Sequence, residues 1–172
     1  MKAMLLSVVL VSGAMAQGPD FKSIGGAARA YQNQVKDAIQ RSAEKMPEDE
    51  YAFKPTPDVR SFGQLIGHVA DAQYAFCSAS MGEKSPVSGI EKSKTAKADL
   101  VSALRDAFAY CDKAYTALTD ANANDVMKFG GSERSRMNVL SFNTMHDFEH
   151  YGNIVTYLRL KGIVPPSSEP RK

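Results

Sequence analysis

The segment RMNVLSFNTMHDFEHYGNIVTYLRLKG, residues 136–162, decides the fold because its apolar side chains recur with the period of an α-helix. Val139 and Tyr157 fall on one side of a helical wheel drawn for this segment. The pattern predicts a helix over about residues 136–161, and Gly162 is a residue type that commonly ends helices.

Three further segments show the same periodicity and predict helices over about residues 21–45, 61–80 and 96–119. Ser61 begins the second of these with a capping box, because Gln64 stands three residues later. The connections are rich in Gly, Pro, Asn and Asp, and no segment is typical of a β-strand. The sequence therefore predicts an all-α fold, a four-helix bundle.

The two ends of the chain are expected to lie outside this bundle. Residues 1–16 combine Lys2, an apolar run and small residues at Ala14 and Ala16, which is the pattern of a cleaved secretory signal peptide. The apolar run is shorter than the ~20 residues that span a bilayer, so no membrane anchor is expected. We expect an exported protein, periplasmic or secreted, with one domain over residues 17–166 and a tail over residues 167–172.

The charge balance makes nucleic acid an unexpected partner. The chain has 21 Lys and Arg against 19 Asp and Glu, and no basic stripe is interleaved with aromatic residues. A small-molecule substrate is the expected partner. The sequence leaves the oligomeric state open, with a homodimer as one option.

The two cysteines, Cys77 and Cys111, are the residues that an oxidising compartment could link. A disulfide requires that their α-carbons approach within about 7 Å, which a sequence does not show. Two buried free thiols are the alternative.

The only three histidines of the chain lie in the middle of predicted helices. His146 and His150 are four residues apart, so they project to one side of their helix, separated by about 40°. Asn143 and Asn153 fall on the same side, where we expect them to support a ligand or line a cleft, and His68 lies on a largely apolar face of the second helix. Three neutral imidazoles that meet inside a bundle could hold one divalent metal ion and leave a position open for water or substrate.

Other interpretations of the histidine pair remain. Paired histidines on a helix are often packed and hydrogen-bonded without a metal. The string HDFEH also matches the H-x-x-E-H motif of inverted zinc peptidases, with Glu149 as general base. That motif needs a third ligand well downstream, whereas the 22 residues after His150 contain one acid, Glu169, so we set the peptidase aside.

A few polar residues near the histidines are candidates for supporting roles. Asp71, three residues after His68, could orient that imidazole or act as a fourth ligand, or it could be a solvated helix acid. The hydroxyl of Tyr157 could reach a cleft beside the site. Asp147 is expected to be a surface charge or a partner of a ligand.

With these residues in hand, the chain resembles the DinB/YfiT-like family. The similarity extends from about residue 21 to residue 166. Two pieces carry it, AEKMPEDEYAFKPTPDVRSFGQLIGHVA with His68, and HDFEHYGNIVTYLRLKGIVPP with His146 and His150. The resemblance implies a four-helix bundle of an up-and-down type, with a divalent-metal site between the second and fourth helices. It implies that His68, His146 and His150 bind one ion of nickel, zinc or iron.

The resemblance also suggests a chemistry. Characterised relatives include thiol-dependent S-transferases and a maleylpyruvate isomerase, which use small thiols such as mycothiol or bacillithiol. Those relatives work in the cytoplasm, whereas this chain carries an export pattern, so the expectation is a metal-dependent enzyme that activates a water or a thiol, of transferase or hydrolase type. A non-catalytic module that binds metal or a small ligand is the alternative.

Overall fold

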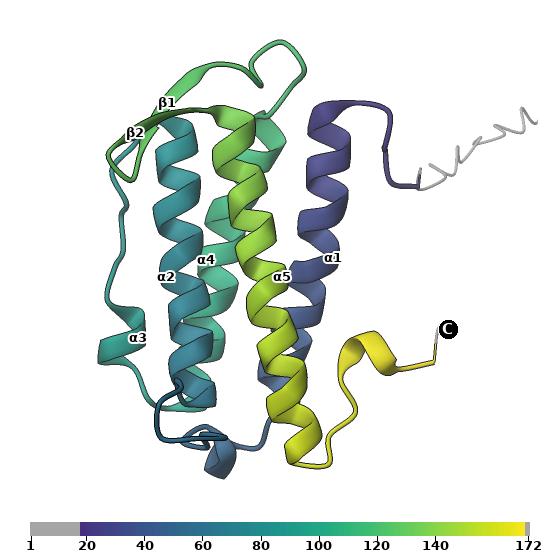
Figure 1. The fold of residues 1–172 in the computed structure, drawn as a ribbon, viewed down its shortest axis with the longest axis vertical. Helices are drawn as coiled ribbons and strands as arrows, with labels where there is room; N and C mark the ends of the chain where they lie inside the picture. Colours follow the sequence, from purple (N-terminus) through teal and green to yellow (C-terminus); the bar gives the residue numbers. More distant parts are fainter. Residues whose placement is uncertain (1–17, 171–172) are drawn as a thin grey trace, which may run out of the picture.

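The computed structural model describes residues 18–170, and the predicted signal peptide lies outside these residues. Four long helices form a bundle (Figure 1), as the sequence predicts. Among the described residues no helix is both long and apolar enough to cross a bilayer. The long helices are α1 (Ile24–Lys45), α2 (Phe62–Met81), α4 (Lys97–Ala117) and α5 (Arg136–Leu160). The short elements are a 3-10 turn (Glu48–Glu50), α3 (Ile90–Ser93), β1 (Val126–Phe129), β2 (Ser132–Ser135) and a second 3-10 turn (Pro166–Ser168).

Side-chain caps fix where the site-bearing helices begin. The predicted capping box of α2 is present: the Gln64 amide donates to Ser61 Oγ (3.1 Å), and the Ser61 amide donates to Gln64 Oε1 (2.8 Å). At the start of α5, Ser135 Oγ accepts from the Asn138 amide (3.2 Å). Each such cap contributes roughly 1 kcal/mol to helix stability.

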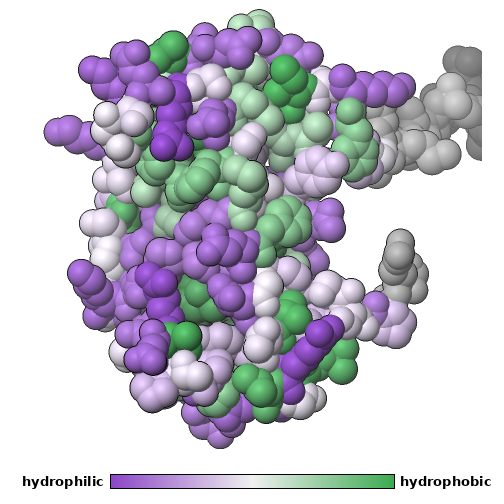
Figure 2. All heavy atoms as spheres, in the orientation of Figure 1, coloured by the Kyte–Doolittle hydropathy of each residue, from purple (hydrophilic) through white to green (hydrophobic). Residues whose placement is uncertain are grey.

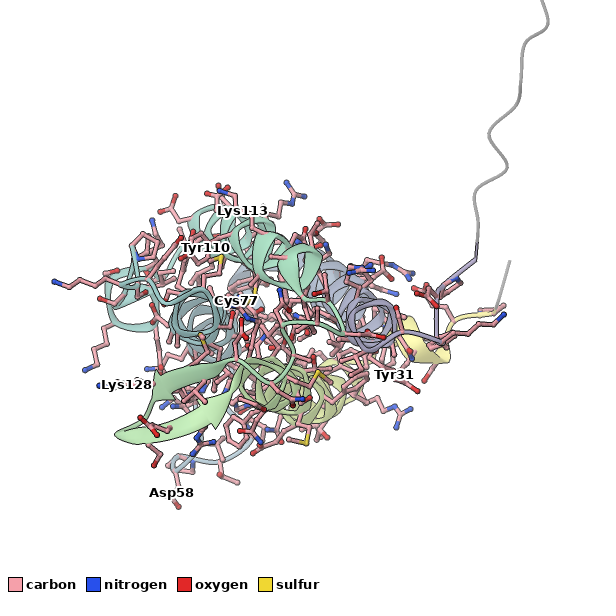
Figure 3. The ribbon with its side chains drawn as sticks, turned by 90° about the horizontal axis from the view of Figure 1, so that it is seen from above. Tyr31, Asp58, Cys77, Tyr110, Lys113 and Lys128 are labelled. Carbon is pink, nitrogen blue, oxygen red and sulfur yellow. A yellow bond between two sulfur atoms is a disulfide. The ribbon has the colours of Figure 1, made fainter. Side chains whose placement is uncertain are left out.

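The four long helices form a square when seen end-on (Figure 3), in the order α1, α4, α2, α5. The bundle is a variant of the up-and-down type, because the long connection after α2 returns the chain to the opposite end before α4 begins. Helix α2 therefore runs parallel to α4 and antiparallel to α5 (Figure 1). Figure 2 shows polar and apolar side chains interspersed over the face that α2 and α5 form.

The connection before α5 contains a β-hairpin, which corrects the expectation that the chain has no strand. Strands β1 and β2 pair antiparallel from Val126 with Ser135 to Phe129 with Ser132. Gly130 and Gly131 make the turn with φ of 59° and 77°, the backbone that a two-residue hairpin requires and that glycine adopts without strain. The double glycine is therefore a hairpin signal, which the polar composition around it obscured.

Two contacts hold the bundle laterally. The disulfide between Cys77 and Cys111 joins α2 to α4 with α-carbons 5.2 Å apart, and both residues are buried. Of the segment predicted as a tail, the part up to Glu169 packs on α1, where Glu169 forms ion pairs with Arg41 and Lys45.

Candidate metal centre

Three histidine side chains from two antiparallel helices converge. His68 lies on α2, and His146 and His150 lie one turn apart on α5. Nε2 of His146 is 3.2 Å from Nε2 of His68 and 2.9 Å from Nε2 of His150. One ligand atom from each histidine lies within 4.8 Å of the other two. The structure thus brings together the three histidines that the sequence singles out.

The nitrogen separations suit a single metal ion. Two nitrogens that each lie about 2.1 Å from one ion, at angles of about 90 to 110°, are about 3.0 to 3.4 Å apart. The contacts from His146 Nε2 to His68 and His150 are close to that range. The same three side chains could therefore ligate one ion from one side and leave the other side open.

The protonation of His68 also favours a cation. Nδ1 of His68 lies 3.2 Å from Glu91 Oε2, so this nitrogen carries the hydrogen and Nε2 presents a lone pair to the other histidines. A hydrogen on Nε2 of His146 could bridge to His68 or to His150 but not to both. A divalent ion would satisfy all three nitrogens together.

The environment keeps the three imidazoles neutral, which is the form that binds metal. Burial, together with the neighbouring histidines, lowers the pKa of His146 and that of His150 to about 4 each. Burial also lowers the pKa of His68, and the positive charge of Arg60 adds to this effect. Protons therefore compete weakly for these nitrogens near neutral pH.

Glu91 holds the His68 ring, and sequence reasoning missed it. It lies on α3, in a connection whose polar composition indicates a solvated loop. The one apolar residue that signals packing there is Ile90, which is buried beside it. His146 is positioned differently, by packing against Phe76 with 5.6 Å between ring centroids.

Two residues of α2 place Glu91. Asp71 accepts hydrogen bonds from the backbone amides of Ile90 (2.9 Å) and Glu91 (3.0 Å), so its carboxylate supports α3 and is not the solvated helix acid that one interpretation expects. Gly67 lets α3 approach, because a Cβ at this position would lie 2.7 Å from the Cα of Glu91. The segment GHVAD thus supplies one histidine of the candidate site and the support for its partner Glu91.

Asp147 and Asn143 lie in the core rather than in the site, which corrects both expectations. Asp147 is fully buried and accepts from Gln73 Nε2 (2.7 Å) and Gln32 Nε2 (2.9 Å), and burial raises its pKa to about 7. The side-chain Nδ2 of Asn143 donates to Gln73 Oε1 (3.1 Å) and to the hydroxyl of Tyr115 (3.2 Å). This network ties α5 to α1 and α2, which fixes the rotation of α5 and the direction of its histidines.

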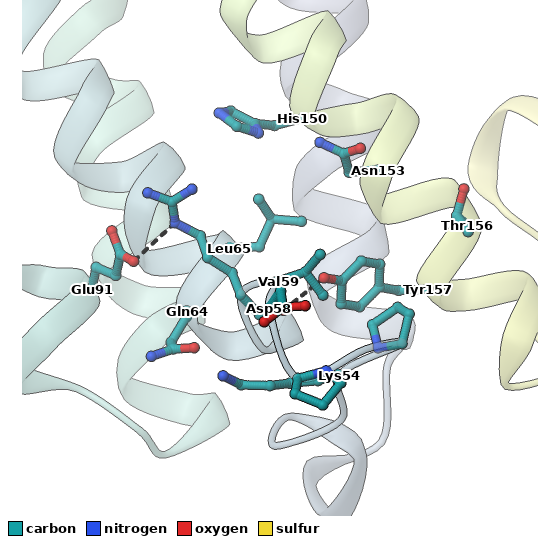
Figure 4. A pocket seen from close by; sticks show the side chains of 13 residues that line it. Lys54, Asp58, Val59, Gln64, Leu65, Glu91, His150, Asn153, Thr156 and Tyr157 are labelled. Carbon is teal, nitrogen blue, oxygen red and sulfur yellow. Dashed lines mark hydrogen bonds and ion pairs between the residues drawn. The ribbon is translucent and has the colours of Figure 1, made fainter.

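A cleft of about 720 Å³ opens beside His150 (Figure 4), within the size range of small-molecule sites. Asn153 and Tyr157 line it from α5. The Tyr157 hydroxyl does not project into the cleft as a free donor, because it donates to the backbone carbonyl of Arg60 (2.6 Å). Asn153 is exposed and is free to meet a ligand.

The fold and the site define a helical bundle in which three converging histidines beside a cleft could hold a metal ion between helices. Within that class the chain belongs to the DinB superfamily, whose family model matches residues 32–154. No curated protein matches the sequence.

Solved structures show the same fold. A DinB-like protein from Bacillus cereus is 15% identical with a TM-score of 0.72, over 86% of this chain and 98% of that one. A DinB-like protein from Bacillus subtilis is 20% identical with a TM-score of 0.68, over 85% and 99%. A conserved protein from Enterococcus faecalis is 16% identical with a TM-score of 0.64, over 78% and 94%. At these identities the likeness concerns the fold.

Proposed function

We propose that this protein is an exported, metal-dependent enzyme that holds one divalent ion on His68, His146 and His150. The observation that carries the proposal is the meeting of three imidazole nitrogens between α2 and α5, next to an open cleft. Nickel, zinc and iron all accept imidazole ligands. Export is supported by the pattern of residues 1–16, and a mature protein that begins at Gln17 by mass spectrometry would test it.

Each part of the site has a defined task in this proposal. When bound, a divalent ion with an open position supplies Lewis-acid chemistry that lowers the pKa of a coordinated water or thiol. Glu91 accepts the Nδ1 hydrogen of His68 and so keeps Nε2 of that ring available. The cleft admits a small molecule beside His150. These parts suit transfer or hydrolysis by an activated nucleophile.

Metal analysis of protein purified without an affinity tag tests the proposal. After incubation with nickel, zinc or iron and removal of unbound metal, we expect about one ion per chain for at least one of the three. X-ray absorption should then show an exchangeable water beside the imidazoles. A protein that stays metal-free with all three metals would contradict the proposal, and a saturated coordination sphere without exchangeable ligand would favour a binding module over an enzyme.

Replacing Glu91 by glutamine should weaken metal binding without unfolding the site. Glutamine keeps an acceptor for His68 Nδ1 but loses the negative charge that raises the basicity of the ring. We expect a loss of about 10- to 100-fold in metal affinity, measured by competition with a metal indicator. Glu83→Gln, in the same connection but bonded to Tyr110, is the matched control and should bind metal as the wild type does. Equal affinities of the two variants would show that Glu91 has no such role.

A further inference from the structure

We infer that the cleft beside the metal centre takes a small organic anion, and that Arg60 binds its carboxylate or other oxyanion group next to His150. This inference rests on the proposed function, since it names the substrate class of the same site. Arg60 precedes the cap of α2 and lines the cleft together with His150.

Arg60 is held in place by one edge of its guanidinium group and leaves the other edge available. Its Nε donates to Glu91 Oε1 (2.9 Å), which is the dashed bond at Glu91 in Figure 4. Its two Nη groups have no hydrogen-bond partner among residues 18–170. A guanidinium fixed at Nε presents a planar pair of donors, which is the geometry that binds a carboxylate or phosphate through two parallel hydrogen bonds.

The carboxylate of Glu91 offsets the formal charge of Arg60, but it binds Nε and leaves the two Nη groups available to a ligand. One oxygen of Glu91 faces Arg60 and the other faces His68 Nδ1, so the carboxylate is shared between two donors. Arg60 and His150 line the same cleft, so the guanidinium group contributes positive potential beside the histidines. A divalent ion on the histidines would add to this potential, and an anion would reduce the repulsion between ion and guanidinium.

The remainder of the ligand can extend toward further cations. The cleft meets a second hollow of about 630 Å³, and the two share Lys54, Gln64 and Glu91. The second hollow adds Lys92 and Lys94. The acid Asp58 lines only the first. An extended molecule with a second anionic group over Lys54 therefore fits this surface better than a neutral or cationic one.

Binding of succinate and of its neutral diamide, succinamide, tests the inference at fixed pH and ionic strength. We expect calorimetry to show saturable succinate binding to the metal-loaded protein and none for succinamide. Arg60→Gln should lower the affinity for succinate at least about tenfold, which corresponds to about 1.4 kcal/mol of binding free energy. Arg105→Gln, which breaks a surface pair with Glu44, is the matched control and should leave succinate binding unchanged.

The outcomes separate this inference from the proposed function. Succinate binding within twofold of the wild type in Arg60→Gln, equal binding of succinamide, or no saturable binding of succinate would each overturn the inference. Metal content measured on the same samples reports on the proposed function. If the wild type takes up no metal yet binds succinate through Arg60, the proposed function fails and the inference stands. If metal binds normally and Arg60→Gln does not change succinate binding, the inference fails and the proposed function stands.

Discussion

Replacing His146 by alanine should deprive the protein of its metal ion. Nε2 of His146 contacts Nε2 of both His68 and His150, so the variant loses the central ligand and retains two nitrogens that are no longer bridged. The chain has no other histidine that could take its place. We expect metal affinity to fall by more than about 100-fold, which exceeds the loss expected when a residue that only hydrogen-bonds to a metal ligand is replaced.

Thermal unfolding with and without metal gives the measurement. A ligand present at about 1,000 times its Kd stabilises the folded state by about 4 kcal/mol, so wild-type Tm should rise clearly on adding metal and the variant's should not. Met145→Ala, at an exposed neighbouring position of α5, is the matched control and should respond as the wild type does. A metal-induced rise in Tm that persists in His146→Ala would show that the ion binds elsewhere.

The long helices are predictable from the sequence because each has apolar residues at helical spacing between connections rich in Gly, Pro, Asn and Asp. On α4 the residues Leu100, Leu104, Cys111 and Tyr115, which recur at helical spacing, are all buried. The short elements are harder to predict because their stability comes from tertiary contacts. The hairpin packs Phe129 on Phe76 of α2, and α3 is held by Asp71, contacts that local composition does not reveal.

The histidines of the candidate site are predictable because they are rare and spaced by one helical turn. The residues that surround the histidines are not predictable in this way, because a helical wheel gives the direction of a helix face but not which residues of other helices pack against it. On α5 the buried residues centre on Asp147, and the histidines lie at the edge of that face, toward α2. A wheel centred on His146 therefore assigns Asp147 to the surface, although it is in the core.

Reducing the disulfide between Cys77 and Cys111 should destabilise the protein by a large fraction of its total stability. The bond closes a loop with a sequence separation of 34, and in the chain-entropy model such a loop contributes roughly 3.5 to 4 kcal/mol by restricting the unfolded chain. Both cysteines are buried, so the bond should resist reductant until the protein unfolds. We expect urea unfolding under dithiothreitol to occur at a clearly lower concentration than without it.

A comparison of oxidised and reduced wild type keeps side-chain volume nearly constant, and Cys77→Ala/Cys111→Ala serves as the second form without the bond. Both should lose a similar free energy of unfolding. Cys111 Sγ accepts a hydrogen bond from the side-chain Nδ2 of Asn143 (3.6 Å). The double variant therefore also tests whether the buried hydrogen-bond network of Asn143 and Asp147 persists without that sulfur. Free thiols in the unfolded, untreated protein, or equal urea midpoints with and without dithiothreitol, would contradict the prediction. A network held mainly by Asp147 and its two glutamine donors should persist, so the reduced protein should still bind its metal ion while folded.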